Sequence, residues 1–115
     1  MEKKEFMLLF RFSPQMDQQP TPEEMNTQEQ QWGNFIGQLA MQEKLISTYQ
    51  LGFEGCILNA NGQQTSGIYL ENGQTIGGNM VLRCKDLEEV AEIAKDCPIL
   101  SMGGNVEIRE IQPMG

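Results

Sequence analysis

The stretch that decides the fold is C-P-I-L-S-M-G-G-N-V-E-I-R-E-I, which runs from Cys97 to Ile111. Before it, I-G-G at Ile76 to Gly78 leads into an apolar strand and then into a helix with an acidic cap. In this order the residues predict a strand, a helix, a Cys-Pro turn, a Gly-Gly turn and a last strand. The carboxyl-terminal third therefore predicts one half of a mixed α and β architecture.

The first strand of the chain is predicted at F-M-L-L-F-R-F, residues 6–12. Its even-numbered positions all carry large apolar side chains, and its odd-numbered face is also mostly apolar, with Arg11 as the exception. A strand that is apolar on both faces is typical of a sheet covered on both sides. We therefore expect helices over one face of the sheet and a second subunit over the other.

A long helix is predicted after a surface loop at residues 13–20. Thr21 can cap it, Pro22 suits the first helical position, and Glu24 can be the partner in a capping box. The helix is expected to end near Glu43. Its apolar stripe, predicted to pack on the even face of the first strand, consists of Met25, Gln28, Trp32, Phe35, Ile36 and Leu39.

The middle of the chain has the pattern of a β-hairpin. F-E-G-C-I-L (53–58) and T-S-G-I-Y-L (65–70) flank Asn61-Gly62, a strong hairpin-turn pair. A second turn is predicted at Asn72-Gly73. Gly77-Gly78 is interpreted as a tight turn before a strand at 79–84.

A second helix is predicted to follow that strand. Asp86 and Glu89 have the spacing of a capping box, and Pro98 is expected to stop the helix. The predicted buried stripe is Leu87, Val90, Ala91 and Ala94. The complete order is strand, helix, hairpin, strand, helix, strand. It predicts a single α+β domain over residues 1–115, with two helices on one face of a ferredoxin-like antiparallel sheet.

Composition excludes several classes of function. Sixteen acidic against eight basic residues give a net charge of -8, which disfavours direct binding to nucleic acid. No apolar stretch could cross a membrane, and no signal-like segment opens the chain, so a cytoplasmic location is expected. Cys56, Cys84 and Cys97 lack the spacing of a disulfide framework or zinc site. They are expected to be buried thiols, and neither a metal nor another cofactor is expected.

Taken together, these fragments resemble the YCII-related family, in the branch named for a DGPF motif. The likeness covers nearly the whole chain: F-M-L-L-F at the first strand, W-x-x-F at Trp32 and Phe35, L-G at Leu51-Gly52, I-G-G for L-G-G, and G-G-N-V-E-I-R for G-G-x-V-E-V-R. The resemblance implies a dimeric α-β barrel. In that assembly the open faces of two sheets pack together and a cleft remains beside the interface.

The chain also departs from the family pattern. Ser66 and Ile68 replace the acid and the proline of D-G-P-F, and Gln74 replaces the second acid of a following E-T-K-E stretch. Glu43 stands where relatives often carry a glycine that ends the helix. Relatives are suspected of using a His-Asp pair, whereas this chain has no histidine. Inherited chemistry would therefore need different groups.

Six residues are candidates for contact with a ligand. Two arginines on the sheet could hold an anion, or they could form structural ion pairs with acids such as Glu107 or Glu54. Residues around the altered motif could line a pocket, or they could be ordinary turn and strand residues. The candidates are Arg11, Ser66, Tyr69, Gln74, Arg83 and Glu107.

Two hypotheses of function remain open. The first is a homodimeric, non-catalytic binding or accessory module with a small-molecule cleft or a protein partner. Genes of DGPF-type relatives often accompany sigma-factor genes, so the resemblance implies an association with transcription initiation. The second is a cofactor-free lyase or isomerase. It requires Glu54, Glu71 or Glu107 to be buried in a cleft with a raised pKa.

Overall fold

The computed structural model describes residues 3–14 and 20–114, so part of the predicted loop at 13–20 lies outside the described residues. The elements follow one another as β1 (Lys4–Phe12), α1 (Pro22–Met41), β2 (Leu45–Gln50), β3 (Cys56–Leu58), β4 (Gln64–Ser66), β5 (Thr75–Cys84), α2 (Leu87–Ala94), α3 (Pro98–Ser101) and β6 (Asn105–Glu110).

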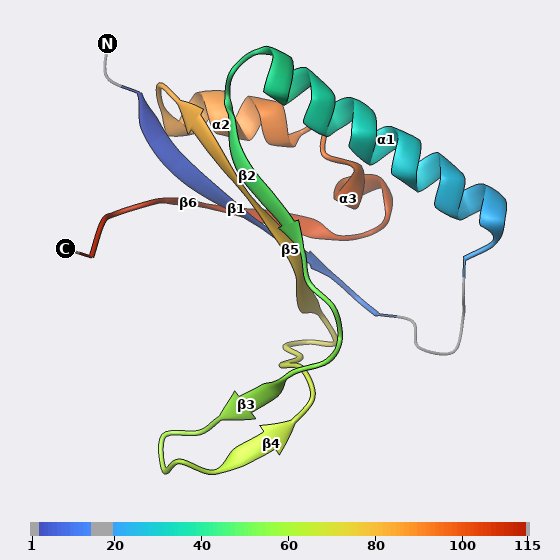
Figure 1. Ribbon diagram of the computed structural model, residues 1–115, viewed down its shortest axis with the longest axis vertical. Helices are drawn as coiled ribbons and strands as arrows, with labels where there is room; N and C mark the ends of the chain where they lie inside the picture. Colours follow the sequence, from blue (N-terminus) through green and yellow to red (C-terminus); the bar gives the residue numbers. More distant parts are fainter. Residues whose placement is uncertain (1–2, 15–19, 115) are drawn as a thin grey trace.

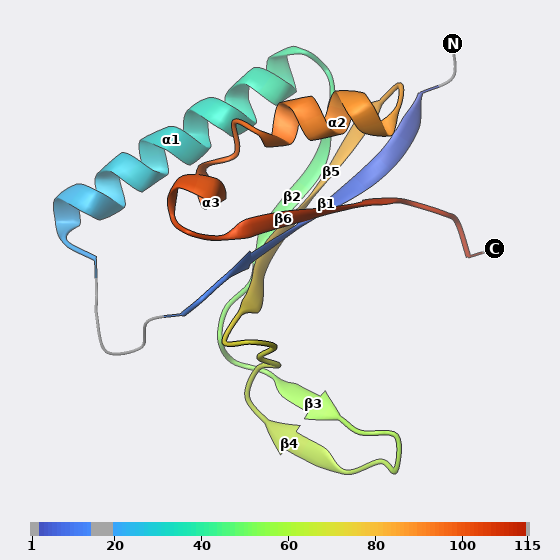
Figure 2. The same cartoon turned by 180° about the vertical axis from the view of Figure 1, so that it is seen from behind.

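The main sheet has four strands in the order β2-β5-β1-β6, and each neighbouring pair is antiparallel. The two long connections from β1 to β2 and from β5 to β6 carry the helices, and α1, α2 and α3 all lie on one face of the sheet (Figures 1 and 2). Strands that alternate with helices in this order form the split βαβ arrangement. The predicted α+β fold with an antiparallel sheet is confirmed.

The hydrophobic core lies between this sheet and the helices. The even-numbered residues from Phe6 to Phe10 in β1 and from Gly78 to Cys84 in β5 are buried, and Leu8, Met80, Leu82 and Val90 have no measurable exposure. From the helices, Phe35 and Leu39 are buried, and Trp32 packs against the core at its edge. The alternating pattern of the strands thus sets which face meets the helices.

The predicted stripe of α2 is partly wrong. Val90 and Ala94 are buried as expected, but Leu87 and Ala91 are exposed. Ile93 packs against the core instead, so the buried face of this short helix is rotated about the helix axis relative to the predicted stripe. The Cys-Pro segment also differs from expectation, because Pro98 begins the one-turn helix α3. In α1, Met25 is about half exposed, at 49%.

The signals for the helix starts are confirmed. Thr21 Oγ1 accepts a hydrogen bond from the backbone N–H of Glu24 at 3.1 Å, with Pro22 in the first turn. Asp86 Oδ1 accepts from the N–H of Glu89 at 2.9 Å, and the Glu89 carboxylate accepts from the N–H of Lys85 at 3.0 Å. Both caps satisfy donors that have no partner within the helix.

The helix α1 ends in a Schellman turn that contains no glycine. The N–H of Lys44 donates to the carbonyl of Leu39 at 3.0 Å, and the N–H of Glu43 donates to Ala40 at 3.1 Å. Between them, Glu43 has a φ of 59°, in the left-handed region. The turn thus has the geometry expected of a glycine, with a β-carbon in the strained position.

The predicted hairpin forms an arm that extends away from the main sheet, which we call the hairpin arm, residues 53–74 (Figure 1). Its paired strands β3 and β4 are only three residues each, shorter than predicted. The turn contains Gly62 at a φ of 86°, and the second predicted turn is confirmed by φ values of 55° at Asn72 and 78° at Gly73. The radius of gyration is 15.9 Å, against about 13 Å for a compact chain of this length, consistent with an extended arm.

The interpretation of Gly77-Gly78 as a turn is wrong, because both glycines lie inside β5. Phe10 pairs with Gly78 and Arg11 with Ile76, so Gly77 is the extra residue of a β-bulge. A β-carbon on Gly78 would lie 2.6 Å from the carbonyl oxygen of Tyr49. The glycines thus permit a close approach of strands where a turn seemed to be indicated.

We expect Glu43→Gly to raise the free energy of unfolding by about 1 kcal/mol, because glycine has no β-carbon to strain at a left-handed φ. Urea denaturation at constant pH would measure the change. Glu43→Ala is the matched control, since it removes the same charge and keeps the β-carbon. An equal gain in both variants would contradict the assignment to backbone strain.

Candidate functional site

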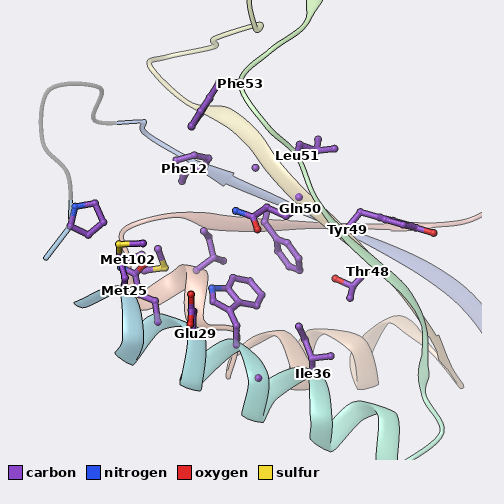
Figure 3. Close-up of a pocket in the computed structure, with 18 residues that line it drawn as sticks. Phe12, Met25, Glu29, Ile36, Thr48, Tyr49, Gln50, Leu51, Phe53 and Met102 are labelled. Atoms are coloured by element: carbon purple, nitrogen blue, oxygen red, sulfur yellow. The ribbon is translucent and has the colours of Figure 1, made fainter. Parts of the chain in front are cut away.

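An open pocket of about 630 Å³ lies between the amino-terminal half of α1 and the end of the sheet (Figure 3). Its walls come from α1, β1, β2, β5, the α3 region and the base of the hairpin arm. The lining residues are Phe10, Phe12, Pro20, Met25, Gln28, Glu29, Trp32, Gly33, Ile36, Thr48, Tyr49, Gln50, Leu51, Phe53, Gly77, Gly78, Ile99 and Met102.

The glycines of β5 give this pocket its depth. A β-carbon on Gly77 would meet the ring of Phe12 at 2.5 Å, so the ring lies directly against the backbone there. Gly33 on α1 faces open space, with no atom within 4 Å of the position that its β-carbon would occupy. Because Gly77 has no side chain, the Phe12 ring can lie against the strand, and Gly33 adds no side chain to the space between helix and strands.

Aromatic side chains are concentrated in the wall of the pocket. The chain has one Trp, two Tyr and five Phe, and five of these eight residues line the pocket. The rings of Phe10 and Trp32 meet edge to face with centroids 5.2 Å apart. Phe12 lies 6.1 Å from Phe53, which comes from the base of the hairpin arm. Both separations are those of interacting aromatic pairs, so the wall is held in place by its own packing.

The polar groups of the pocket are few. Thr48 Oγ1 donates to the carbonyl of Asn79 at 2.9 Å, so the donor of this hydroxyl is already in use. The lining also contains three long polar side chains, those of Gln28, Glu29 and Gln50. Among residues 3–14 and 20–114, no group of three or more acidic, cysteine or histidine residues could hold a metal ion. The arrangement is suited to binding an apolar molecule with a small polar part.

Three of the predicted site residues lie together on the opposite face of the sheet. Arg11 Nη1 donates to Glu107 Oε1 at 2.6 Å, so the structural ion pair that the sequence left open is present. Arg109 lies 3.4 Å from the other oxygen of Glu107. Asn105, which is opposite Arg11 in the sheet, donates to Gln74 Oε1 at 3.0 Å. These contacts form a small polar network next to the root of the hairpin arm.

The other three predicted residues lie apart from this network. Arg83 pairs with Glu5 at 3.1 Å, at the far end of the same strands. Ser66 and Tyr69 are exposed on the hairpin arm. None of the six candidates lines the pocket, and their contact with a ligand stays a prediction.

The residues that do line the pocket were not identified from the sequence. Trp32 and Met25 were assigned to the core stripe, although α1 extends beyond the sheet at its amino-terminal end. The helix α1 contains two glycines, Gly33 and Gly37, and only Gly33 lines the pocket, so the signal in the sequence is weak. A glycine in a helix interior lowers stability, so its presence there suggests a need for space.

The cysteines differ from one another. Burial raises the pKa of the Cys84 thiol to about 11, with a contribution from a hydrogen bond to Glu89. Burial also raises the pKa of Cys97 to about 11. Cys56 is exposed on β3, so the expectation that it is buried is wrong. Its strand belongs to the hairpin arm, which no helix covers.

Comparison with known protein families gives one match. The sequence model of the YCII-related domain matches residues 5–115 of this chain. No curated protein matches the sequence. In the described part of the chain, no helix is long and apolar enough to cross a membrane.

We expect Arg11→Met to raise the pKa of Glu107, which the hydrogen bond from Arg11 and the charges of Arg11 and Arg109 hold below its ordinary value. The pKa of Glu107 is lower in the folded than in the unfolded state. The ion pair therefore stabilises the fold at pH values above the unfolded pKa, and this contribution is lost as the pH falls through the lower pKa of the folded state. Carboxyl ¹³C NMR titration would measure the shift.

The control for this substitution is Arg83→Met, which removes a cation bound to Glu5. It should leave the titration of Glu107 where it is in the wild type. The same titration midpoint for Glu107 in Arg11→Met and wild type would contradict the prediction.

Proposed function

This chain belongs to the YCII-related family, and we propose that it is a small-molecule binding module whose ligand is a mainly apolar compound held in the pocket beside Trp32. The observation that carries the proposal is the pocket itself, of about 630 Å³, in a chain of only 115 residues. Ligand sites commonly have volumes of about 300 to 1,000 Å³ and mostly apolar walls. A protein this small gains stability by closing such a space, so an open aromatic pocket favours a binding role.

Binding is favoured over catalysis by the state of the candidate bases. The lyase or isomerase alternative requires a buried glutamate with a raised pKa. Glu54 and Glu71 are exposed, and the pKa of Glu107 is lowered by Arg11. None of the three lines the pocket. A general base needs to reach the proton that it removes, and none of these carboxylates is part of the pocket wall.

We further propose that two copies associate through the open face of the sheet, as in a dimeric α-β barrel. Met7 and Leu9 are half-buried on this face. Val81 is 8% exposed, and its strand β5 lies between β1 and β2. The chain has 8621 Å² of accessible surface, whereas a folded monomer of 13.0 kDa has about 6,300 Å². Part of this difference comes from the extended hairpin arm, and a standard interface would cover roughly 800 Å² on each partner.

We also propose that the chain belongs to the DGPF branch of the family and that it acts together with the transcription-initiation machinery. The support for both proposals is the order of the family-like fragments in the sequence. With a net charge of -8, contact with such machinery would pass through a protein partner.

Gly33→Leu tests the binding function directly, because the added side chain enters the pocket from α1 without meeting another atom at its β-carbon. The probe is N-phenyl-1-naphthylamine, a neutral aromatic compound that fluoresces in apolar surroundings. We expect its affinity to fall roughly tenfold or more, or about 1.4 kcal/mol. Gly37→Leu is the matched control, since Gly37 is in the same helix, has equal space and does not line the pocket.

Both substitutions replace a helical glycine, so both should preserve or increase stability. Equal binding by the two variants, or no binding by the wild type, would overturn the proposed pocket function.

Met7→Glu tests the proposed dimer. Met7 is opposite Arg109 in the sheet, so a single chain accommodates the new charge, whereas a partner packed closely on Met7 and Leu9 would bury it. We expect a dimer for the wild type in native mass spectrometry and sedimentation equilibrium, and a monomer for the variant. Met41→Glu, at a position that is 86% exposed at the end of α1, should remain dimeric. A monomeric wild type would refute the interface.

A further inference from the structure

The pocket has one charged side chain among its described lining residues, the carboxylate of Glu29. No lysine or arginine contributes to the wall, although the chain has eight of them. Glu29 stands on the side of α1 that faces the strands (Figure 3), one turn before Trp32 on the same helical face. Glu29 is exposed, so solvent screens part of its charge, but an anionic ligand would meet this carboxylate with no compensating cation among the described lining residues.

The aromatic wall has the same preference. The faces of aromatic rings carry negative potential and attract cations, and tryptophan does so most strongly. Phe10 meets Trp32 edge to face, and Phe12 and Phe53 are tilted by 51°, so the rings present their faces in several directions around the space. Met25 and Met102 add polarisable sulfur at one end of the pocket. Several ring faces beside a carboxylate are the groups that recognise alkylammonium ions.

We propose that the ligand is an organic cation with an apolar body, a hydrophobic amine or a quaternary ammonium compound. This inference rests on the proposed binding function and specifies its ligand class. The ammonium group lies between Glu29 and the ring of Trp32, and the apolar part extends over Gly77 and Phe12 toward Phe53. The net charge of -8 adds a long-range attraction for cations that salt weakens.

Three probes of similar size separate charge from shape. Benzyltrimethylammonium is the cation, and neopentylbenzene is its neutral isostere, in which carbon replaces nitrogen. Benzenesulfonate is the anion. Displacement of N-phenyl-1-naphthylamine measures each affinity, and quenching of Trp32, the chain's one tryptophan, reports occupancy of the pocket directly. We expect the cation to bind roughly tenfold more tightly than the isostere at low salt, and the anion to bind most weakly.

Glu29→Gln tests the carboxylate, because the amide keeps the shape of the side chain and removes its charge. The preference for the cation should fall to roughly threefold and lose most of its dependence on salt. Glu23→Gln is the matched control: it makes the same change in net charge on the same helix at a residue that does not line the pocket. It should retain the wild-type preference. Phe53→Leu, at a position that is 48% exposed, should lower affinity for the cation more than for the isostere.

The outcomes distinguish this inference from the function on which it rests. Equal or tighter binding of the neutral isostere or the anion would overturn the cation preference and leave the pocket as a binding site. Equal losses in Glu29→Gln and Glu23→Gln would assign the preference to net charge and overturn the role of Glu29. Failure of every probe, N-phenyl-1-naphthylamine included, would overturn both proposals.

Discussion

The antiparallel pairing of β1 with β5 is the constraint on which the rest of the structure depends. It extends over the full length of both strands, from Lys4 opposite Cys84 to Phe12 opposite Thr75. The pairing places the side chains of Phe6, Leu8 and Phe10 in β1 and of Met80, Leu82 and Cys84 in β5 under the helices. It also places β2 and β6 on the outer sides of the pair. A shift by one residue would turn the phenylalanines of β1 toward the open face and remove the surface on which α1 packs.

The bulge at Gly77 connects this pairing to the pocket. From Lys4 opposite Cys84 to Phe10 opposite Gly78, the side chains of the two strands alternate regularly and the core is closed. At the bulge the alternation is interrupted, the ring of Phe12 lies over bare backbone, and the chain leaves the sheet toward the hairpin arm. Bulges occur where a sheet must change direction or reorient a side chain. Here the same irregularity forms the floor of the pocket and the root of the arm.

Much of the fold could be predicted from the sequence, because local signals and tertiary packing agreed. The caps at Thr21 and Asp86 and the alternation in β1 each depend on a few neighbouring residues. The pocket could not be predicted, because it depends on how far α1 extends beyond the sheet and on glycines that approach distant strands. The same limitation applies to Gly77-Gly78, since a glycine pair has no local signal that distinguishes a turn from a close strand contact. The Arg11–Glu107 pair was among the alternatives, since both residues alternate outward on strands of one sheet.

The placement of the first strand in the middle of the sheet also affects how the chain is made. Both strand partners of β1 come from the second half of the sequence, and Phe6 is opposite Glu110. During synthesis at about 5 to 20 residues per second, roughly 5 to 20 s separate the appearance of β1 from that of its last partner. Until β5 has been made, β1 is an apolar strand without a native strand partner. In that period α1, which is made directly after β1, is the element of the fold that can cover those phenylalanines.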